Sequence, residues 1–317
     1  MVSNAGGLNP RSCAEHINEI AGKIGLNPTI AYVDGDDLMG RIHDLVSTDN
    51  LKPFSPDIPL GDFESYVTAN AYLGCWGIVE ALNQQADVVI TGRVTDAAVV
   101  CGPAAWHHGW ASNDYDQLAG AVVAGHIIEC GAQATGGNFS FFTEISERNE
   151  IGGKARFGFP WAEIAHDGSS IIGKHDGTGG LINTETITSQ ILYEIGGPEY
   201  LGPDVTARFD TIKIENSGPD RVKVSEVKGQ SPPSTLKVAM NELGGYRNSF
   251  SVALTGLDIE EKAAFAQAAF WDSCPYQSND FETITSEVIR TDKQDPDQQE
   301  KATAIWKITV KDQDERK

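Results

Sequence analysis

The chain has 317 residues, of which 40% are hydrophobic and 22% charged, so it is long enough and apolar enough to bury a core. Its 45 acidic and 24 basic side chains give a formal net charge of -21, which argues against binding to nucleic acid or to an anionic membrane. The five cysteines are scattered and form no C-x-x-C pair, which excludes a disulfide framework or a zinc knuckle.

Two further features concern the compartment. The sequence contains no run of about 18 apolar residues, so no membrane span is expected. Unpaired cysteines in apolar stretches indicate a reducing environment, and we expect a cytoplasmic protein. The opening residues, 2–7, read like the end of a strand and its loop, so a segment before them could contain a targeting signal.

Residues 1–100 alternate between glycine loops, helix patterns and short apolar runs, which predicts βα units around a mostly parallel sheet flanked by helices. Pro10 predicts the first turn of a helix that extends to about Gly22, because the missing N–H of proline costs nothing there. Apolar runs at 29–33 and 87–91 predict buried strands. A second helix is expected from about Asp62, since four apolar residues follow at spacings of three and four: Tyr66, Ala69, Leu73 and Trp76.

Further helices are predicted after Asp96, from Asn113 to Cys130, and over 184–194. The stretch 139–175 is rich in aromatic residues and is expected to be irregular or strand. We therefore expect an α/β domain over 1–203.

A smaller α+β domain is expected over 204–317. Four strand candidates follow one another at 209–215, 221–227, 236–241 and 249–255, and a fifth lies at 304–310. Asp258 and Glu261 predict a capping box at the start of the one helix between them.

Three loops that follow predicted strands contain polar groups beside glycine. They include Asn4, Gly6 and Gly7 in the first, Asp34 in the second, and Arg93 with Asp96 in the third. Ligands of open α/β sheets bind at the carboxyl ends of strands, so these residues are candidates for binding an anionic substrate. Free backbone N–H groups before a helix suit an anion, and arginine suits a carboxylate or phosphate.

His126 and Glu129 are separated by three residues on one predicted helix, so they are candidates for general acid–base catalysis. His175 precedes a glycine-rich loop, 176–180, which resembles an anion nest and contains Thr178. We regard His175 as a catalytic candidate and Thr178 as a binding one. Asn138, after two glycines, and Arg247, in a glycine turn of the second domain, complete the candidate binding residues. No metal-ligand set is assigned.

Short strings over nearly the whole chain give a family resemblance. They lie at 3–10, 69–74, 90–96, 125–131, 134–138, 174–180, 192–196 and 254–258. Together they resemble the acyclic terpene utilisation (AtuA) family. The resemblance implies acyl-CoA or branched-acid breakdown, because members occur in catabolic gene sets for citronellol-like terpenes, beside acyl-CoA carboxylase and dehydrogenase proteins. It also implies that the first domain lacks its first strand and that the second is truncated at its carboxyl end.

We interpret the sequence as an enzyme of hydratase or lyase type that acts on a small anionic organic substrate, an acyl-CoA or a branched carboxylate. No cofactor is assigned: coenzyme A would enter as a thioester substrate, and no nucleotide-binding motif is present. Two alternatives stay open. One is a non-catalytic subunit that docks on an acyl-CoA carboxylase or dehydrogenase, or that forms a homo-oligomer. The other is a metal-dependent hydrolase that uses four residues: Asp34, Asp36, His126 and His175.

Overall fold

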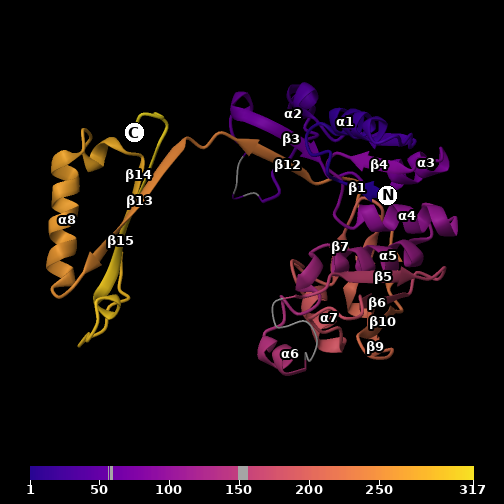
Figure 1. Ribbon diagram of the computed structural model, residues 1–317. Helices are drawn as coiled ribbons and strands as arrows, with labels where there is room; N and C mark the ends of the chain where they lie inside the picture. The colour runs from indigo at the N-terminus through magenta and orange to yellow at the C-terminus, as the bar shows by residue number, and fades with distance from the viewer. Residues whose placement is uncertain (56, 58–59, 149–155) are drawn as a thin grey trace. The chain divides into compact units, whose positions relative to one another are not determined.

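The structure is a computed structural model that describes residues 1–55, 57, 60–148 and 156–317. These residues form two compact units, Met1–Asn241 and Glu242–Lys317 (Figure 1). The first unit contains the larger hydrophobic core, and the second has a smaller core of its own.

The first unit begins with a three-stranded parallel sheet in the order β1-β4-β2. Its elements are β1 (Val2–Ser3), α1 (Pro10–Lys23), β2 (Ile30–Val33) and β4 (Val88–Thr91). The helix predicted from Pro10 and both apolar strands are confirmed. Val2 lies opposite Val89, so the residues before Asn4 do form a strand.

The helix predicted from Asp62 is wrong. Asp62 caps only a short 3-10 turn, Phe63–Ser65, and the next residues form strand β3 (Tyr66–Ala71). Strand β3 pairs with the distant β12 (Val238–Glu242), and helix α3 begins later, at Trp76 (Trp76–Asn83). Tertiary pairing therefore overrides a three-and-four spacing that arose by coincidence.

The centre of the first unit is a pair of adjacent helices, α4 (Ala98–His108) and α5 (Tyr115–Ile128), which lie side by side in Figure 1. Every residue of α5 from Leu118 to Ile127 is buried. A helix that is apolar on all sides belongs inside a core, and α5 is packed by helices and by strands of two further sheets.

Shorter elements complete the first unit. The helices are α2 (Ile42–Ser47), α6 (Phe142–Arg148) and α7 (Thr184–Ile191). The strands are β5 (Pro160–Ile164), β6 (Ser170–Lys174), β7 (Glu199–Leu201), β8 (Thr206–Arg208), β9 (Lys213–Asn216), β10 (Arg221–Ser225) and β11 (Lys228–Gln230). They form two antiparallel sheets, in the orders β5-β6-β10-β9 and β11-β8-β7.

These sheets correct the predicted fold class. The chain mixes helices and strands as expected, but in the sheets of three or four strands among the described residues, parallel pairing is limited to β1, β2 and β4. The connections from β5 to β6 and from β9 to β10 are too short for the crossover of about a dozen residues that parallel strands need. The first unit also extends past residue 203, because β8 and β11 pack on α5.

The second unit is an antiparallel sheet with one helix on it. Its strands, in the order β13-β15-β14, are β13 (Tyr246–Thr255), β14 (Thr283–Ile289) and β15 (Thr303–Asp312), and its helix is α8 (Ile259–Ser273). Leu254, Trp306 and Ile308 of the sheet form its core with Ile259 of α8. The capping box predicted at Asp258 is wrong, because this residue has a φ of 59° and its side chain makes no cap hydrogen bond.

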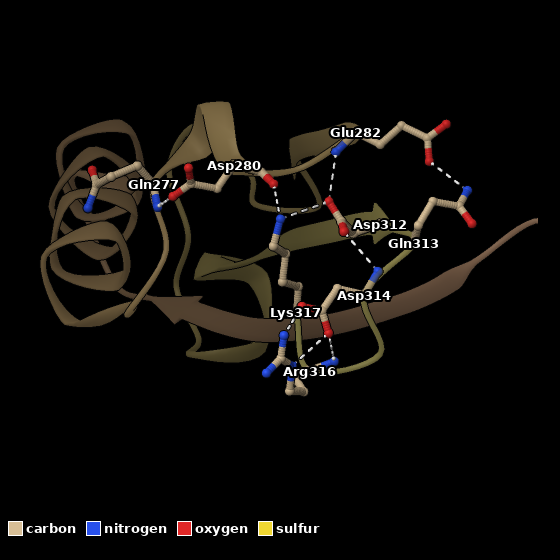
Figure 2. Close-up of polar contacts among 8 residues, drawn as sticks. All are labelled: Gln277, Asp280, Glu282, Asp312, Gln313, Asp314, Arg316 and Lys317. Carbon is tan, nitrogen blue, oxygen red and sulfur yellow. Dashed lines mark hydrogen bonds and ion pairs between the residues drawn. The ribbon is translucent and has the colours of Figure 1, made fainter.

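Polar contacts tie the end of β15 to the turn before β14 (Figure 2). The Asp312 carboxylate accepts hydrogen bonds from the Lys317 ammonium at 3.2 Å and from the Asp314 amide at 2.9 Å. The same ammonium donates to the Asp280 carbonyl oxygen. The Arg316 guanidinium donates hydrogen bonds to both carboxylate oxygens of Asp314, at 2.9 and 2.6 Å. The basic residues at this end of the chain are therefore already engaged by acidic ones.

No helix among the described residues combines the length and the apolar character that crossing a membrane requires.

We predict that Gly6→Ala destabilises the first unit, because a Cβ atom there would lie 2.5 Å from the Thr91 carbonyl oxygen and 2.6 Å from Pro10 Cα. Overpacking of this kind costs about 1–3 kcal/mol. Gly22→Ala, in the helix α1 that follows this turn, is the control, since a Cβ there meets no atom within 4 Å, and it should be neutral or stabilising by about 1 kcal/mol. Urea unfolding compares the two variants, and equal stabilities would contradict this explanation.

Candidate functional site

The backbone amides of the first predicted binding loop make hydrogen bonds within the protein. The Gly6 amide donates to the Thr91 carbonyl oxygen at 3.1 Å, and the Gly7 amide donates to the Asn4 carbonyl oxygen at 3.4 Å. Gly7 has a φ of 53°, which glycine adopts without strain. Both amides thus hold the turn that leads into α1.

The second loop presents Asp34 to solvent but buries Asp36. The Asp36 carboxylate accepts hydrogen bonds from Asn70 Nδ2 and from the Arg93 amide, each at 2.9 Å. A Cβ atom on Gly92 would lie 2.4 Å from Asp36 Oδ1, so the third loop must pass this carboxylate with a glycine. Asp36 therefore positions the loop that contains Arg93.

Arg93 lies between a carboxylate and an aromatic ring. Its Nη2 atom is 2.7 Å from Asp96 Oδ1, and its Cζ atom is 4.3 Å from the centroid of Tyr72. The Lys237 ammonium approaches the same ring to 4.8 Å. Arg93 and Asp96, two candidates from the same predicted loop, form an ion pair. Tyr72 and Lys237, which join them, were not predicted.

Tyr72, Asp96 and Lys237, but not Arg93, line a cavity of about 650 Å³ in the first unit. Its polar lining consists of Tyr72, Thr95, Asp96, Glu129, Glu194, Tyr200, Asp204, Thr235 and Lys237. Its apolar lining includes Phe54, Val122, Leu201, Pro203, Val205, Pro233 and Leu236. A volume of this size suits a small organic ligand.

Glu129, one of the two predicted residues from the α5 region, faces this cavity. Burial, followed by the charges of Asp96 and Glu194 and a hydrogen bond with Asp96, raises the pKa of Glu129 from 4.5 to about 7. Burial and the nearby Glu129 carboxylate also raise the pKa of Tyr200 to about 12. Near neutral pH, Glu129 can therefore both accept and donate a proton, and the Tyr200 hydroxyl keeps its proton.

His126 lies deeper than Glu129. Only 2% of its surface is exposed, and its ring centroid is 5.4 Å from that of Tyr200 and 5.5 Å from that of Phe209. Burial lowers the pKa of His126, and nearby backbone carbonyls, first that of Ile191, partly oppose the shift. Its Nε2 atom is buried with no hydrogen-bond partner in the described part of the chain. Tyr200 thus lies against His126 and also lines the cavity.

The remaining candidates lie elsewhere. His175 is exposed in the turn after β6, where its carbonyl oxygen accepts the Thr178 hydroxyl at 2.6 Å and Thr178 in turn accepts Lys174 Nζ at 2.9 Å. Asn138 donates to the Gln190 side chain at 2.7 Å. Arg247 is exposed on β13 of the second unit. Within the first unit, His175, Thr178 and Asn138 are not among the residues that line the cavity.

The four residues of the metal-hydrolase alternative do not converge either. Among the described residues, no three histidine, cysteine, aspartate or glutamate side chains are gathered in a way that could hold a metal ion. Asp36 is engaged by Asn70 and by the Arg93 amide, and His126 lies among aromatic rings.

Asp204 is a site residue that sequence reasoning did not find. Both of its carboxylate oxygens lie 3.0 Å from the Cys75 amide at the N-terminus of α3, and burial raises its pKa. A Cβ atom on Gly74 would overlap this carboxylate, so glycine is required beside it. Glu194 was missed as a lining residue too, although it belongs to the family-like string 192–196 that follows α7.

A family model described as acyclic terpene utilisation family protein AtuA matches residues 1–317. Comparison with curated proteins and with solved structures gives no match.

We predict that Glu129 makes the stability of the first unit fall as pH rises. Its pKa is higher in the folded chain, about 7, than its ordinary value of 4.5, so folding favours the protonated form. The stabilisation that protonated Glu129 contributes to the folded chain is fully present below pH 4.5 and is lost as pH rises through about 7. Glu129→Gln should remove this dependence, whereas Glu80→Gln, on the exposed face of α3, should behave like the parent chain. Urea unfolding from pH 4 to 8 measures it, and parallel curves for all three proteins would contradict the prediction.

Proposed function

The chain belongs to the acyclic terpene utilisation family AtuA, and we propose that it is an enzyme of hydratase or lyase type that acts on an acyl-CoA or a branched carboxylate. Membership of the family indicates a role in acyclic terpene utilisation. The observation that supports an enzyme is the cavity residue Glu129, whose pKa of about 7 matches the requirement of an acid–base catalyst at neutral pH.

The chemistry of hydration assigns two roles to this carboxyl group. As a carboxylate, Glu129 accepts a proton from a water molecule whose oxygen forms a bond to the β-carbon of an unsaturated acyl group. The protonated Glu129 then gives a proton to the α-carbon, so that H and OH have been added across the double bond. Dehydration is the reverse, and a lyase would use the same proton transfers to break a neighbouring carbon–carbon bond.

Tyr200 supports this chemistry as a hydrogen-bond donor. Its hydroxyl stays protonated because its pKa is about 12, and it lines the same cavity as Glu129. A neutral donor near the carbonyl oxygen of a thioester or acid stabilises the negative charge that develops there during proton transfer at the α-carbon.

The apolar part of the cavity fits the hydrocarbon of such a substrate. Pro203 and Pro233 line it together with Leu201, Leu236 and Phe54. Branched aliphatic chains gain about 0.8 kcal/mol for each CH₂ group that they bury against surfaces of this kind.

We predict that Glu129→Gln lowers kcat for hydration of a branched 2-enoyl-CoA by about 100-fold or more, with a much smaller effect on KM, because glutamine cannot transfer the proton. Loss of the enoyl thioester absorbance measures the reaction. The parent chain should show an inflection in kcat/KM near the pKa of Glu129, about 7, and Glu80→Gln should match the parent.

Two outcomes would contradict the proposal that the chain is an enzyme of this type. Equal rates for the parent and Glu129→Gln would show that this carboxyl group has no catalytic role. No turnover of enoyl, hydroxyacyl or branched acid substrates by a well-folded chain would favour the non-catalytic alternative, which pull-down with an acyl-CoA carboxylase then tests.

A further inference from the structure

Two cations contact the ring of Tyr72, and one of them, Lys237, lines the cavity together with that ring. Arg93 Cζ lies 4.3 Å and Lys237 Nζ lies 4.8 Å from the centroid of Tyr72. Asp96 neutralises Arg93 at 2.7 Å, but Lys237 has no carboxylate within 4.0 Å among the described residues. The Tyr72 end of the cavity therefore has one positive charge without a partner, in a chain whose net charge is -21.

The backbone holds these groups in place without a ligand. The Tyr72 amide donates to the Lys237 carbonyl oxygen at 2.8 Å, and the Leu73 amide donates to the Arg93 carbonyl oxygen at 3.2 Å. The Thr95 amide returns a hydrogen bond to the Leu73 carbonyl oxygen at 2.9 Å. Three segments far apart in sequence are thus joined, so the backbone of Lys237 needs little reorganisation when its side chain binds an anion.

Arg93 has further donor capacity. Its Nε atom is buried and has no hydrogen-bond partner among the described residues, although its Nη2 atom pairs with Asp96. A guanidinium group has five N–H donors in a planar fork, and only one of its hydrogen bonds to another side chain is observed.

Exposed apolar side chains surround the same cavity. Phe54 is 99% exposed, Leu201 is 64% exposed and Leu236 is 48% exposed, and all three line it. Large apolar side chains gathered around a concave site indicate a ligand that covers them. Leu236 precedes Lys237 directly, so the apolar and the cationic features adjoin.

The carboxylates of the cavity limit where an anion can bind. Glu129 and Glu194 act on each other electrostatically, and a negative group placed between them would be repelled. At Tyr72, two cations face one carboxylate, Asp96. An acidic group is therefore accepted at Tyr72, and the part of the ligand beside Glu129 must be uncharged.

We infer that Lys237 binds the acidic group of an amphipathic ligand beside Tyr72, and that the apolar chain of the ligand covers Phe54, Leu201 and Leu236. The inference rests on the proposed function in using the same cavity, and it deepens it by naming the residue that binds the acidic group of the substrate. The acidic group is a carboxylate or a phosphate, which correspond to a free branched acid and to the coenzyme A part of a thioester.

Calorimetric titration of the full chain tests this with three probes: citronellic acid, its methyl ester and coenzyme A. If the carboxylate is the bound group, the acid should bind at least about tenfold more tightly than the ester, because a charge-assisted contact is lost in the ester. Lys237→Gln should abolish this preference and Lys237→Arg should keep it. Lys223→Gln, which removes an exposed lysine of β10, is the matched control and should bind like the parent.

Coenzyme A distinguishes the two sources. If it binds and Lys237→Gln weakens it at least about tenfold, while the acid and ester bind alike, the bound group is a phosphate. If no probe shows a Lys237-dependent preference, the inference is overturned. Glu129→Gln should keep the preference for the anion while losing turnover, so failure of this inference and failure of the proposed reaction give different results.

Discussion

The buried carboxylate of Asp36 is the constraint on which the geometry of the cavity depends. It lies at the end of β2, binds the side chain of Asn70 in β3 and binds the amide of Arg93 after β4, so one group joins three segments. The Asp36 carbonyl oxygen also accepts the Ala71 amide at 2.8 Å. A buried charge is stable only when hydrogen bonds replace its water, and here the replacement requires that Arg93 stay where it is.

Asp204 joins the later part of the first unit to the same centre in a comparable way. Its carboxylate accepts the Cys75 amide at the start of α3, where the partial positive charge of a helix N-terminus favours an anion. It comes from the segment between β7 and β8, and it brings Tyr200 and Leu201 to the cavity that Asp96 borders. Two internal carboxylates, each bound to a backbone amide far away in sequence, thus assemble the lining.

The sequence predicted the local parts of this arrangement and missed the distant ones. Pro10 predicted α1, the apolar run at 87–91 predicted β4, and the position of loops at strand ends pointed to Arg93 with Asp96. The sequence from Tyr66 predicts a helix, because the spacing of its apolar residues contains no information about its pairing with the distant strand β12. Lys237 is fixed beside Tyr72 by that same pairing, so it could not be found. Spacing predicted that His126 and Glu129 act together, but His126 is buried against Tyr200 and Phe209, whereas Glu129 lines the cavity.

The positions of charge in the cavity explain why acidic residues can serve a site for an acidic ligand. Burial, and then the charges of Asp96 and Glu194, raise the pKa of Glu129 to about 7, so this carboxyl group retains a proton over part of the neutral range. That proton lowers the negative charge of the cavity lining, while Arg93 and Lys237 supply positive charge beside Tyr72. The proposed ligand, with an anionic group and an uncharged reacting bond, would then meet positive charge at Tyr72 and a protonated carboxyl group at its reacting bond.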